Sequence, residues 1–208
     1  RARAPMVPLS WLVHRTLGAV NGVGFLINFG YFGALFVLSL YLQNVEHLSA
    51  RQTGLVLLPL AVSLSAGNLL AGKLMARISM PNMMVGGLLI SGVGLLATSA
   101  ALTAHAPMWL ACAAMVVFGG GTALAVTPMT SSILAAAPGA LAGTASGLLN
   151  AARQTGSLLG VAVAGAAVTL MPDVAHALPT VFGLMTVAYA GAVAMAWISR
   201  RPAATALA

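Results

Sequence analysis

Long stretches without charge dominate the chain, and six of them reach the length of a membrane span. They cover residues 17–42, 54–72, 83–102, 108–134, 143–171 and 178–198. About 20 residues of helix cross a hydrocarbon core of about 30 Å. The runs are apolar on all sides, whereas a barrel strand would alternate over about ten residues. The pattern therefore predicts an all-α membrane protein with six transmembrane helices.

The links between these runs are short and contain helix breakers. Pro81 with Asn82, Pro107, Pro138 with Gly139, and Pro172 with Asp173 mark four of them. Short links place consecutive helices antiparallel to one another. We expect a lead-in at residues 1–16, one helical bundle over residues 17–198, and a tail at residues 199–208.

Composition supports a membrane location. Of the 208 residues 60% are hydrophobic and 5% are charged, which leaves too little polar surface for a soluble domain. The formal charge is +7, but the basic residues are scattered between apolar runs, so a nucleic-acid partner is not expected. One side of the predicted topology holds most of them: Arg1, Arg3, Arg15, Lys73, Arg77, Arg200 and Arg201, against Arg51 on the other. This bias predicts that both termini are cytoplasmic.

Polar residues recur at helical spacing in four of the six runs. Asn21, Gly24, Asn28 and Tyr31 share a face of the first run, and Ser65 and Asn68 form a shorter face of the second. The fourth run carries Thr122, Thr127 and Thr130, and Ser146, Asn150, Arg153 and Ser157 share a face of the fifth. The third and sixth runs hold only isolated hydroxyls such as Ser91 and Tyr189. We predict that four helices line a common polar path and two face lipid. The alternative is that each polar residue only joins helices, at about 0.6 kcal/mol per hydrogen bond.

Arg153 is the one charge inside the fifth run. A charge at the centre of a membrane helix costs about 2.5 to 3.5 kcal/mol, so such residues usually face a bundle interior or a cavity. The alternative is an anchor that snorkels to the cytoplasmic headgroups. The residues predicted to form the substrate path or its gate are Asn21, Asn28, Tyr31, Asn68, Thr127, Asn150, Arg153 and Gln154.

Glycines and prolines suggest where helices pack or bend. Three glycine pairs have the four-residue spacing that allows close helix approach: Gly18 with Gly22, Gly143 with Gly147, and Gly156 with Gly160. Pro59 and Pro128 lie inside the second and fourth runs, where a proline removes a backbone hydrogen bond.

The chemistry available at membrane depth is sparse. Glu46 and Asp173 are the only acids, and both fall in loops on the outer side; the four histidines also fall outside the runs. A conventional proton relay is therefore not expected from this chain alone. No catalytic triad, metal-ligand cluster or phosphate-binding motif is present, and Cys112 is the only cysteine. We expect no enzyme activity, no metal and no cofactor.

Three segments resemble the fourteen-helix drug:proton antiporters of the major facilitator superfamily. They are residues 40–43 with 49–59 (LYLQ and SARQTGLVLLP), residues 145–156 (ASGLLNAARQTG), and residues 72–77 (GKLMAR). The last is similar to a degenerate form of the cytoplasmic Gly-x-Leu-x-Asp-Arg motif. Gly72, Lys73 and Arg77 match it, and Ala76 stands where an acid is usual.

The resemblance implies the C-terminal half of a secondary transporter, built of two three-helix units of inverted topology. Its implied partners are the lipid bilayer, the missing N-terminal half, small hydrophobic or cationic substrates, and protons through the missing half. The chain opens Arg-Ala-Arg with no initiator methionine or signal sequence, from which we expect a piece of a longer protein. The expected location is the plasma (inner) membrane of a bacterium, with multidrug efflux by alternating access. The alternatives are an exporter of a specific metabolite, such as an amino acid or sugar, and a non-transporting six-helix scaffold.

Overall fold

A computed structural model describes residues 15–136 and 141–199 and contains six α-helices in those ranges. The helices are α2 (Arg15–Asn44), α3 (Ala50–Leu74), α4 (Met80–Thr103), α5 (Met108–Ala136), α6 (Ala142–Leu170) and α7 (Val174–Ser199). No strand occurs in the described ranges. The predicted all-helical fold class is confirmed.

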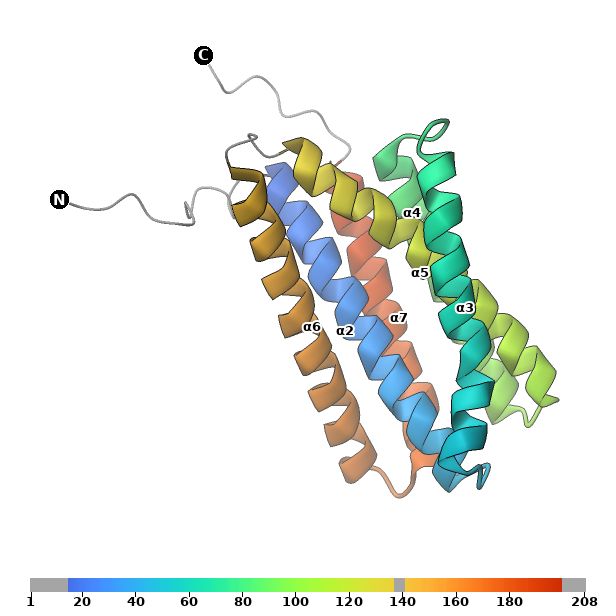
Figure 1. The fold of residues 1–208 in the computed structure, drawn as a ribbon. Coiled ribbons are helices and arrows are strands. Elements are labelled where there is room, and N and C mark those ends of the chain that lie inside the picture. The colour runs from blue at the N-terminus through green and yellow to red at the C-terminus, as the bar shows by residue number, and fades with distance from the viewer. Residues whose placement is uncertain (1–14, 137–140, 200–208) are drawn as a thin grey trace, which may run out of the picture.

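Consecutive helices run antiparallel and form two groups of three (Figure 1). In one group α2 packs against α6 and α7, and in the other α5 packs against α3 and α4. The groups meet mainly where α4 contacts α7, with a smaller contact between α2 and α5.

The main packing pattern is unchanged when the two halves of the chain are exchanged. Replacing α2 by α5, α3 by α6 and α4 by α7 turns the α2–α6 contact into α5–α3 and the α2–α7 contact into α5–α4. Each helix runs opposite to its counterpart, because three antiparallel steps separate them (Figure 1). This is the inverted three-helix arrangement that the resemblance implied.

Large apolar side chains lie on both the inside and the outside of the bundle. Leu88, Leu95 and Met115 are fully buried, whereas Leu69 is 75% exposed and Leu158 is 73% exposed. Exposed leucines along whole helices suit a lipid environment. Five of the six helices are long and apolar enough to cross a membrane. The other, α6, is 29 residues long, but its polar face around Arg153 lowers its apolar character.

Close packing of α2 on α6 depends on two glycines. A Cβ added to Gly156 would meet the carbonyl oxygen of Phe25, and one added to Gly160 would meet that of Phe29. Neither obstacle is a flexible side chain, so the two backbones could not stay in place. Gly22 lies against the Met195 side chain.

The other predicted glycines lie elsewhere. Gly143 and Gly147 are exposed, and a Cβ on either would have no described neighbour within 4 Å. The same spacing thus produces contact at one pair and none at the other, because only Gly156 and Gly160 face α2. Gly18 is partly buried on α2.

Two helices begin four residues before the predicted runs, because polar residues cap them. Ser49 and Gln52 form a capping box at the start of α3, which begins at Ala50 rather than at residue 54. Asp173 accepts a hydrogen bond of 2.9 Å from the His176 amide ahead of α7. Pro59 and Pro128 lie inside α3 and α5, as does Pro179 inside α7.

Several predictions concern residues outside the described ranges. These are the first fourteen residues of the lead-in, the Pro138–Gly139 link, and the tail beyond Ser199, with the topology signals Arg1, Arg3, Arg200 and Arg201.

Candidate functional site

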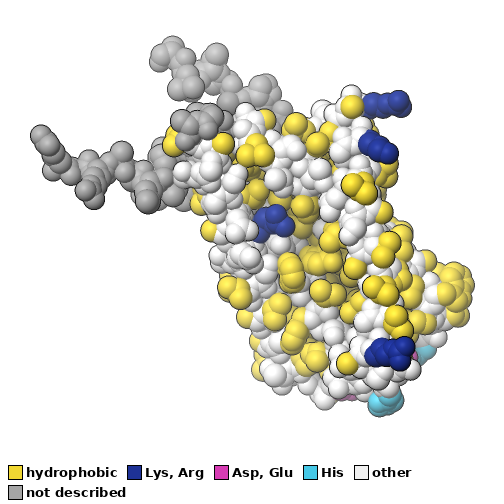
Figure 2. Space-filling model, viewed as in Figure 1, with side chains coloured by type: hydrophobic (Ala, Val, Ile, Leu, Met, Phe, Trp, Pro, Cys, Tyr) yellow, Lys and Arg dark blue, Asp and Glu magenta, His cyan; other side chains and the backbone are white. Residues whose placement is uncertain are grey.

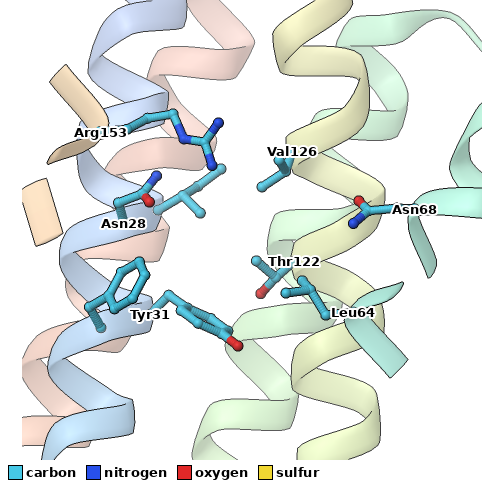
Figure 3. A pocket seen from close by; sticks show the side chains of 9 residues that line it. Asn28, Tyr31, Leu64, Asn68, Thr122, Val126 and Arg153 are labelled. Atoms are coloured by element: carbon cyan, nitrogen blue, oxygen red, sulfur yellow. The ribbon is translucent and has the colours of Figure 1, made fainter. Parts of the chain in front are cut away.

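A hollow lies between α2, α3, α5 and α6, on the face shown in Figure 2. Its cavity volume is about 170 Å³. The side chains that line it come from all four helices (Figure 3): Ile27, Asn28, Tyr31, Phe32, Leu64, Asn68, Thr122, Val126 and Arg153. The four helices whose polar faces predicted a shared path are the four that line this hollow, and α4 and α7 contribute nothing to it.

Arg153 enters the hollow from α6. It lies eleven residues after Ala142, or roughly 16 Å along the axis, and only three residues from the helix midpoint. Its stem passes over Gly24, where an added Cβ would lie 3.3 Å from Arg153 Cγ. The guanidinium points toward α2 and the hollow (Figure 3), not along α6 toward its end. A bulkier residue at position 24 would therefore displace the arginine.

The Arg153 guanidinium has no hydrogen bond or ion pair with any residue that the structure describes. The side chain is partly buried. A guanidinium carries five donors that need acceptors when water is excluded. This free donor set is the least satisfied polar group of the hollow.

Asn28 lies beside Arg153 on the α2 wall. It is 6% exposed, and its amide Nδ2 donates to the Gly24 carbonyl at 2.8 Å. Its carbonyl oxygen has no partner within the described part of the chain. Both residues also border a second hollow of about 160 Å³, which Phe32, Asn150, Gln154 and Ser157 complete. Asn28, Phe32 and Arg153 line both hollows and thus lie between them.

Asn68 and Thr127 act together on the opposite wall. The Thr127 hydroxyl donates to Asn68 Oδ1 at 3.0 Å. Asn68 lines the hollow, whereas Thr127 is not among the residues that line it. The bond holds the amide with its carbonyl turned to Thr127, so the Nδ2 donors remain available.

A buried hydroxyl cluster joins the two helix groups behind the hollow. Ser91 and Thr122 are 2.8 Å apart, and Thr122 and Tyr189 are 3.1 Å apart, measured between hydroxyl oxygens. Ser91 and Thr122 also donate to the Phe118 carbonyl, each at 2.9 Å. The prediction that Ser91 and Tyr189 are isolated hydroxyls was wrong. Helical spacing shows which face a residue shares, but not which residue of another helix meets it.

Aromatic rings continue this cluster to the hollow. Tyr31 stacks on Phe118 with ring centroids 5.6 Å apart, and Phe118 meets Tyr189 edge-on at 5.9 Å. Tyr31 lines the hollow itself. Sequence spacing indicated Tyr31 but not the two rings behind it.

The remaining predicted site residues lie away from the hollow. Asn21 is 5% exposed and donates to the Leu17 carbonyl, while its own carbonyl oxygen has no described partner. Lys73 and Arg77 lie exposed at the end of α3, and neither forms an ion pair with a described residue. Gly72 has open space around its Cβ position.

The acids and the described histidines lie at one end of the bundle, in or beside the α2–α3, α4–α5 and α6–α7 links. Asp173 pairs with His176 at 2.8 Å, and hydrogen bonds from the His176 backbone and ring lower the pKa of the Asp173 carboxyl. Among the described residues no group of three potential ligands is placed to hold a metal ion.

Comparison with known proteins places this chain in a family. The family model of the Major Facilitator Superfamily matches residues 3–161. The chain is 33% identical over 191 residues to a methylenomycin A resistance protein of Streptomyces coelicolor, with coverage of 91% of this chain and 40% of that protein. It is 32% identical over 197 residues to the methylenomycin A resistance protein of Bacillus subtilis, with coverage of 95% and 42%.

A third relative is the multidrug resistance protein Stp of Mycobacterium tuberculosis, 30% identical over 185 residues, with coverage of 86% and 34%. The chain therefore spans about two fifths or less of the length of these relatives. The family match covers most of the described helices, and the six-helix bundle agrees with it. The chain is a multi-pass membrane protein that belongs to the Major Facilitator Superfamily.

Proposed function

We propose that this chain forms the C-terminal half of a drug exporter and that its hollow is one wall of the substrate path. The observation that carries the proposal is the free Arg153 guanidinium in a hollow lined by four helices. A charge near the middle of a membrane helix is costly and usually functional. The relatives are named for resistance to antibiotics or drugs, which favours a drug over a metabolite.

The dimensions of the hollow support a substrate site that is shared between this half and a second half. Its volume of about 170 Å³ is below the range of about 300 to 1,000 Å³ usual for small-molecule sites. The hollow is also open on the face formed by α3 and α6 (Figure 2). A second half placed over this face would close the site and bury the substrate between halves. Rocking of the halves around such a site gives alternating access.

Proton coupling is proposed to use groups outside this chain. The two carboxylates of the whole sequence, Glu46 and Asp173, lie after α2 and before α7. Neither lines the hollow. The proposed location is the plasma membrane of a bacterium, with both termini cytoplasmic because of the basic bias. In this orientation Lys73 and Arg77 belong to a cytoplasmic loop.

The test is drug susceptibility of a sensitive bacterium that expresses the complete transporter. We expect growth at raised concentrations of several unrelated drugs and a lower accumulation of a fluorescent substrate. Dissipating the proton gradient should restore accumulation. Unchanged susceptibility across the panel, with the protein present in the membrane at normal level, would argue against drug export.

A further inference from the structure

We infer that the hollow selects substrates with a carboxylate or similar anionic group, which pairs with Arg153. This inference rests on the proposed export function and names its substrate class. It differs from the expectation of cationic substrates. The evidence is the charge of the hollow, the direction of its hydrogen-bond donors and its apolar surface.

Among the residues that the structure describes, Arg153 is the only charged one that lines the hollow. The chain's two acids are remote from it, since Glu46 follows α2 and Asp173 precedes α7. In Figure 2 the acidic side chains lie only at the lower end of this face, whereas basic side chains lie at its upper and lower right edges and beside the hollow. This wall of the site is therefore positively charged. In a site from which water is excluded, a nearby cation on the ligand would be strongly repelled.

Hydrogen-bond donors outnumber acceptors in the hollow. Arg153 offers its donors unpaired, and Asn68 keeps its Nδ2 donors because Thr127 occupies its carbonyl. The Thr122 hydroxyl donates to the Phe118 carbonyl. On the α2 wall the Asn28 carbonyl is left over as an acceptor, and the Tyr31 hydroxyl, which can donate or accept, also lines the hollow. Arg153 and Asn68 face each other across the hollow (Figure 3), so an acceptor-rich group fits between them.

A carboxylate matches this arrangement better than a neutral acceptor. Its two oxygens can take parallel hydrogen bonds from one guanidinium, and such charge-assisted bonds are about twice as strong as neutral ones. Most of the remaining lining is apolar: Ile27, Phe32, Leu64, Val126 and the ring of Tyr31. These side chains suit the hydrophobic body of the same molecule. The structure thus points to an amphiphilic organic acid.

The competing explanation is that an acid of the other half pairs with Arg153. Such a pair would neutralise the hollow, and the site would then show no preference for anions. The two explanations differ in how replacing Arg153 affects charged and uncharged ligands of the same shape.

The experiment uses three ligands with one ring system: 1-naphthaleneacetate, its methyl ester, and naphthylmethyl trimethylammonium. Binding to the purified complete transporter is measured by calorimetry for wild type, Arg153→Gln and Arg153→Lys. Arg51→Gln is the matched control, because it removes the same charge from the exposed start of α3. The order in which wild type binds the three ligands can be measured without any variant, so the inference can still be tested if Arg153→Gln fails to fold.

We expect wild type to bind the acid more tightly than the ester, and the ammonium least. Arg153→Gln should weaken binding of the acid by about 10- to 100-fold and leave the affinity for the ester nearly unchanged. Arg153→Lys should keep part of the preference, since it retains the charge without the planar fork. Arg51→Gln should alter none of the three.

Three results would overturn the inference. The first is that the acid fails to bind wild type, and the second is that the ammonium compound binds as tightly as the acid. The third result is that Arg153→Gln lowers the affinities for acid and ester equally. The last would assign Arg153 to a pair within the protein. None of these results bears on drug export, which the susceptibility assay tests separately.

Discussion

Arg153 is the residue whose replacement best separates a site role from an anchor role. If its planar donors act in the hollow, both Arg153→Ala and Arg153→Lys should reach normal membrane levels in the complete transporter and lose most efflux. Asn150→Ala, in the adjoining hollow, should lose less. The measurement is efflux of a fluorescent substrate, normalised to folded protein.

Leu158→Ala is the control for this series, because Leu158 lies on α6 and is 73% exposed. Leu149, one turn before Arg153, does not serve, since it is 3% exposed and packs in the core. Wild-type efflux by Arg153→Lys would reduce Arg153 to a membrane anchor, because a lysine also reaches the headgroups.

Sequence spacing indicated much of the site at this scale. It grouped Asn150, Arg153 and Ser157 on one face, and the structure places all three around one hollow. It also indicated Asn21, which lies elsewhere in the bundle. The periodicity of one helix shows that residues share a face, whereas the contact with another helix decides whether that face lines a cavity.

At the scale of the helices, Gly160 fixes how closely α6 approaches α2. Gly160→Ala should destabilise the bundle by about 1 to 3 kcal/mol, since the new Cβ meets the backbone at Phe29. Gly183→Ala on α7 is the matched control, with no described neighbour within 4 Å. It should be neutral or stabilising by up to about 1 kcal/mol through helix propensity. Thermal unfolding in detergent compares the two, and equal melting temperatures would contradict the close packing.

The start of α7 depends on the charge of Asp173. Hydrogen bonds from His176 favour the carboxylate and lower its pKa below the ordinary 3.8. Because the folded-state pKa is depressed, the stabilisation is present above pH 3.8 and is lost as the pH falls through the lowered folded-state pKa. Asp173→Ala should therefore lower the melting temperature near neutral pH.

The effect of Asp173→Ala should shrink as the medium becomes more acidic. Asp173→Asn should be milder at neutral pH, since asparagine also caps helices well. A difference between wild type and Asp173→Ala that stays constant from pH 7 to about pH 3 would contradict a charge-dependent cap.

The same caps explain what the sequence could and could not predict about the helices. The length of the apolar runs predicted six helices, because a membrane span needs about 20 apolar residues. The runs begin too late for α3 and α7. The first turn of α3 is polar and is capped by Ser49 with Gln52, and the first turn of α7 contains His176, whose amide donates to Asp173. Hydropathy shows where the apolar run ends. A helix extends past the end of that run wherever a cap satisfies the hydrogen bonds of its terminal backbone groups.

For the whole molecule, the antiparallel order places residues 50, 104 and 175 at one end and residue 76 at the other. The basic bias predicts that the first end is outside the cell. With Cys112 replaced by alanine, single cysteines at Ala50, Ala104 and Ala175 should react with an impermeant thiol reagent on intact cells. Ala76→Cys should react only after the cells are opened, and the reverse pattern would invert the topology.

Tyr189 has a further consequence for the whole molecule. Its ring borders an apolar groove between α4 and α7 on the back of the bundle, with Leu89 and Val93, and its hydroxyl reaches Thr122, which lines the front hollow. At this level the side chains of Tyr189 and Thr122 together reach from the groove to the hollow. Tyr189→Ala should open a lateral passage to the bilayer, which leak of a hydrophobic dye through the purified, reconstituted transporter would reveal. Tyr189→Phe should keep the seal and cost about 1 kcal/mol of stability through the lost hydrogen bond.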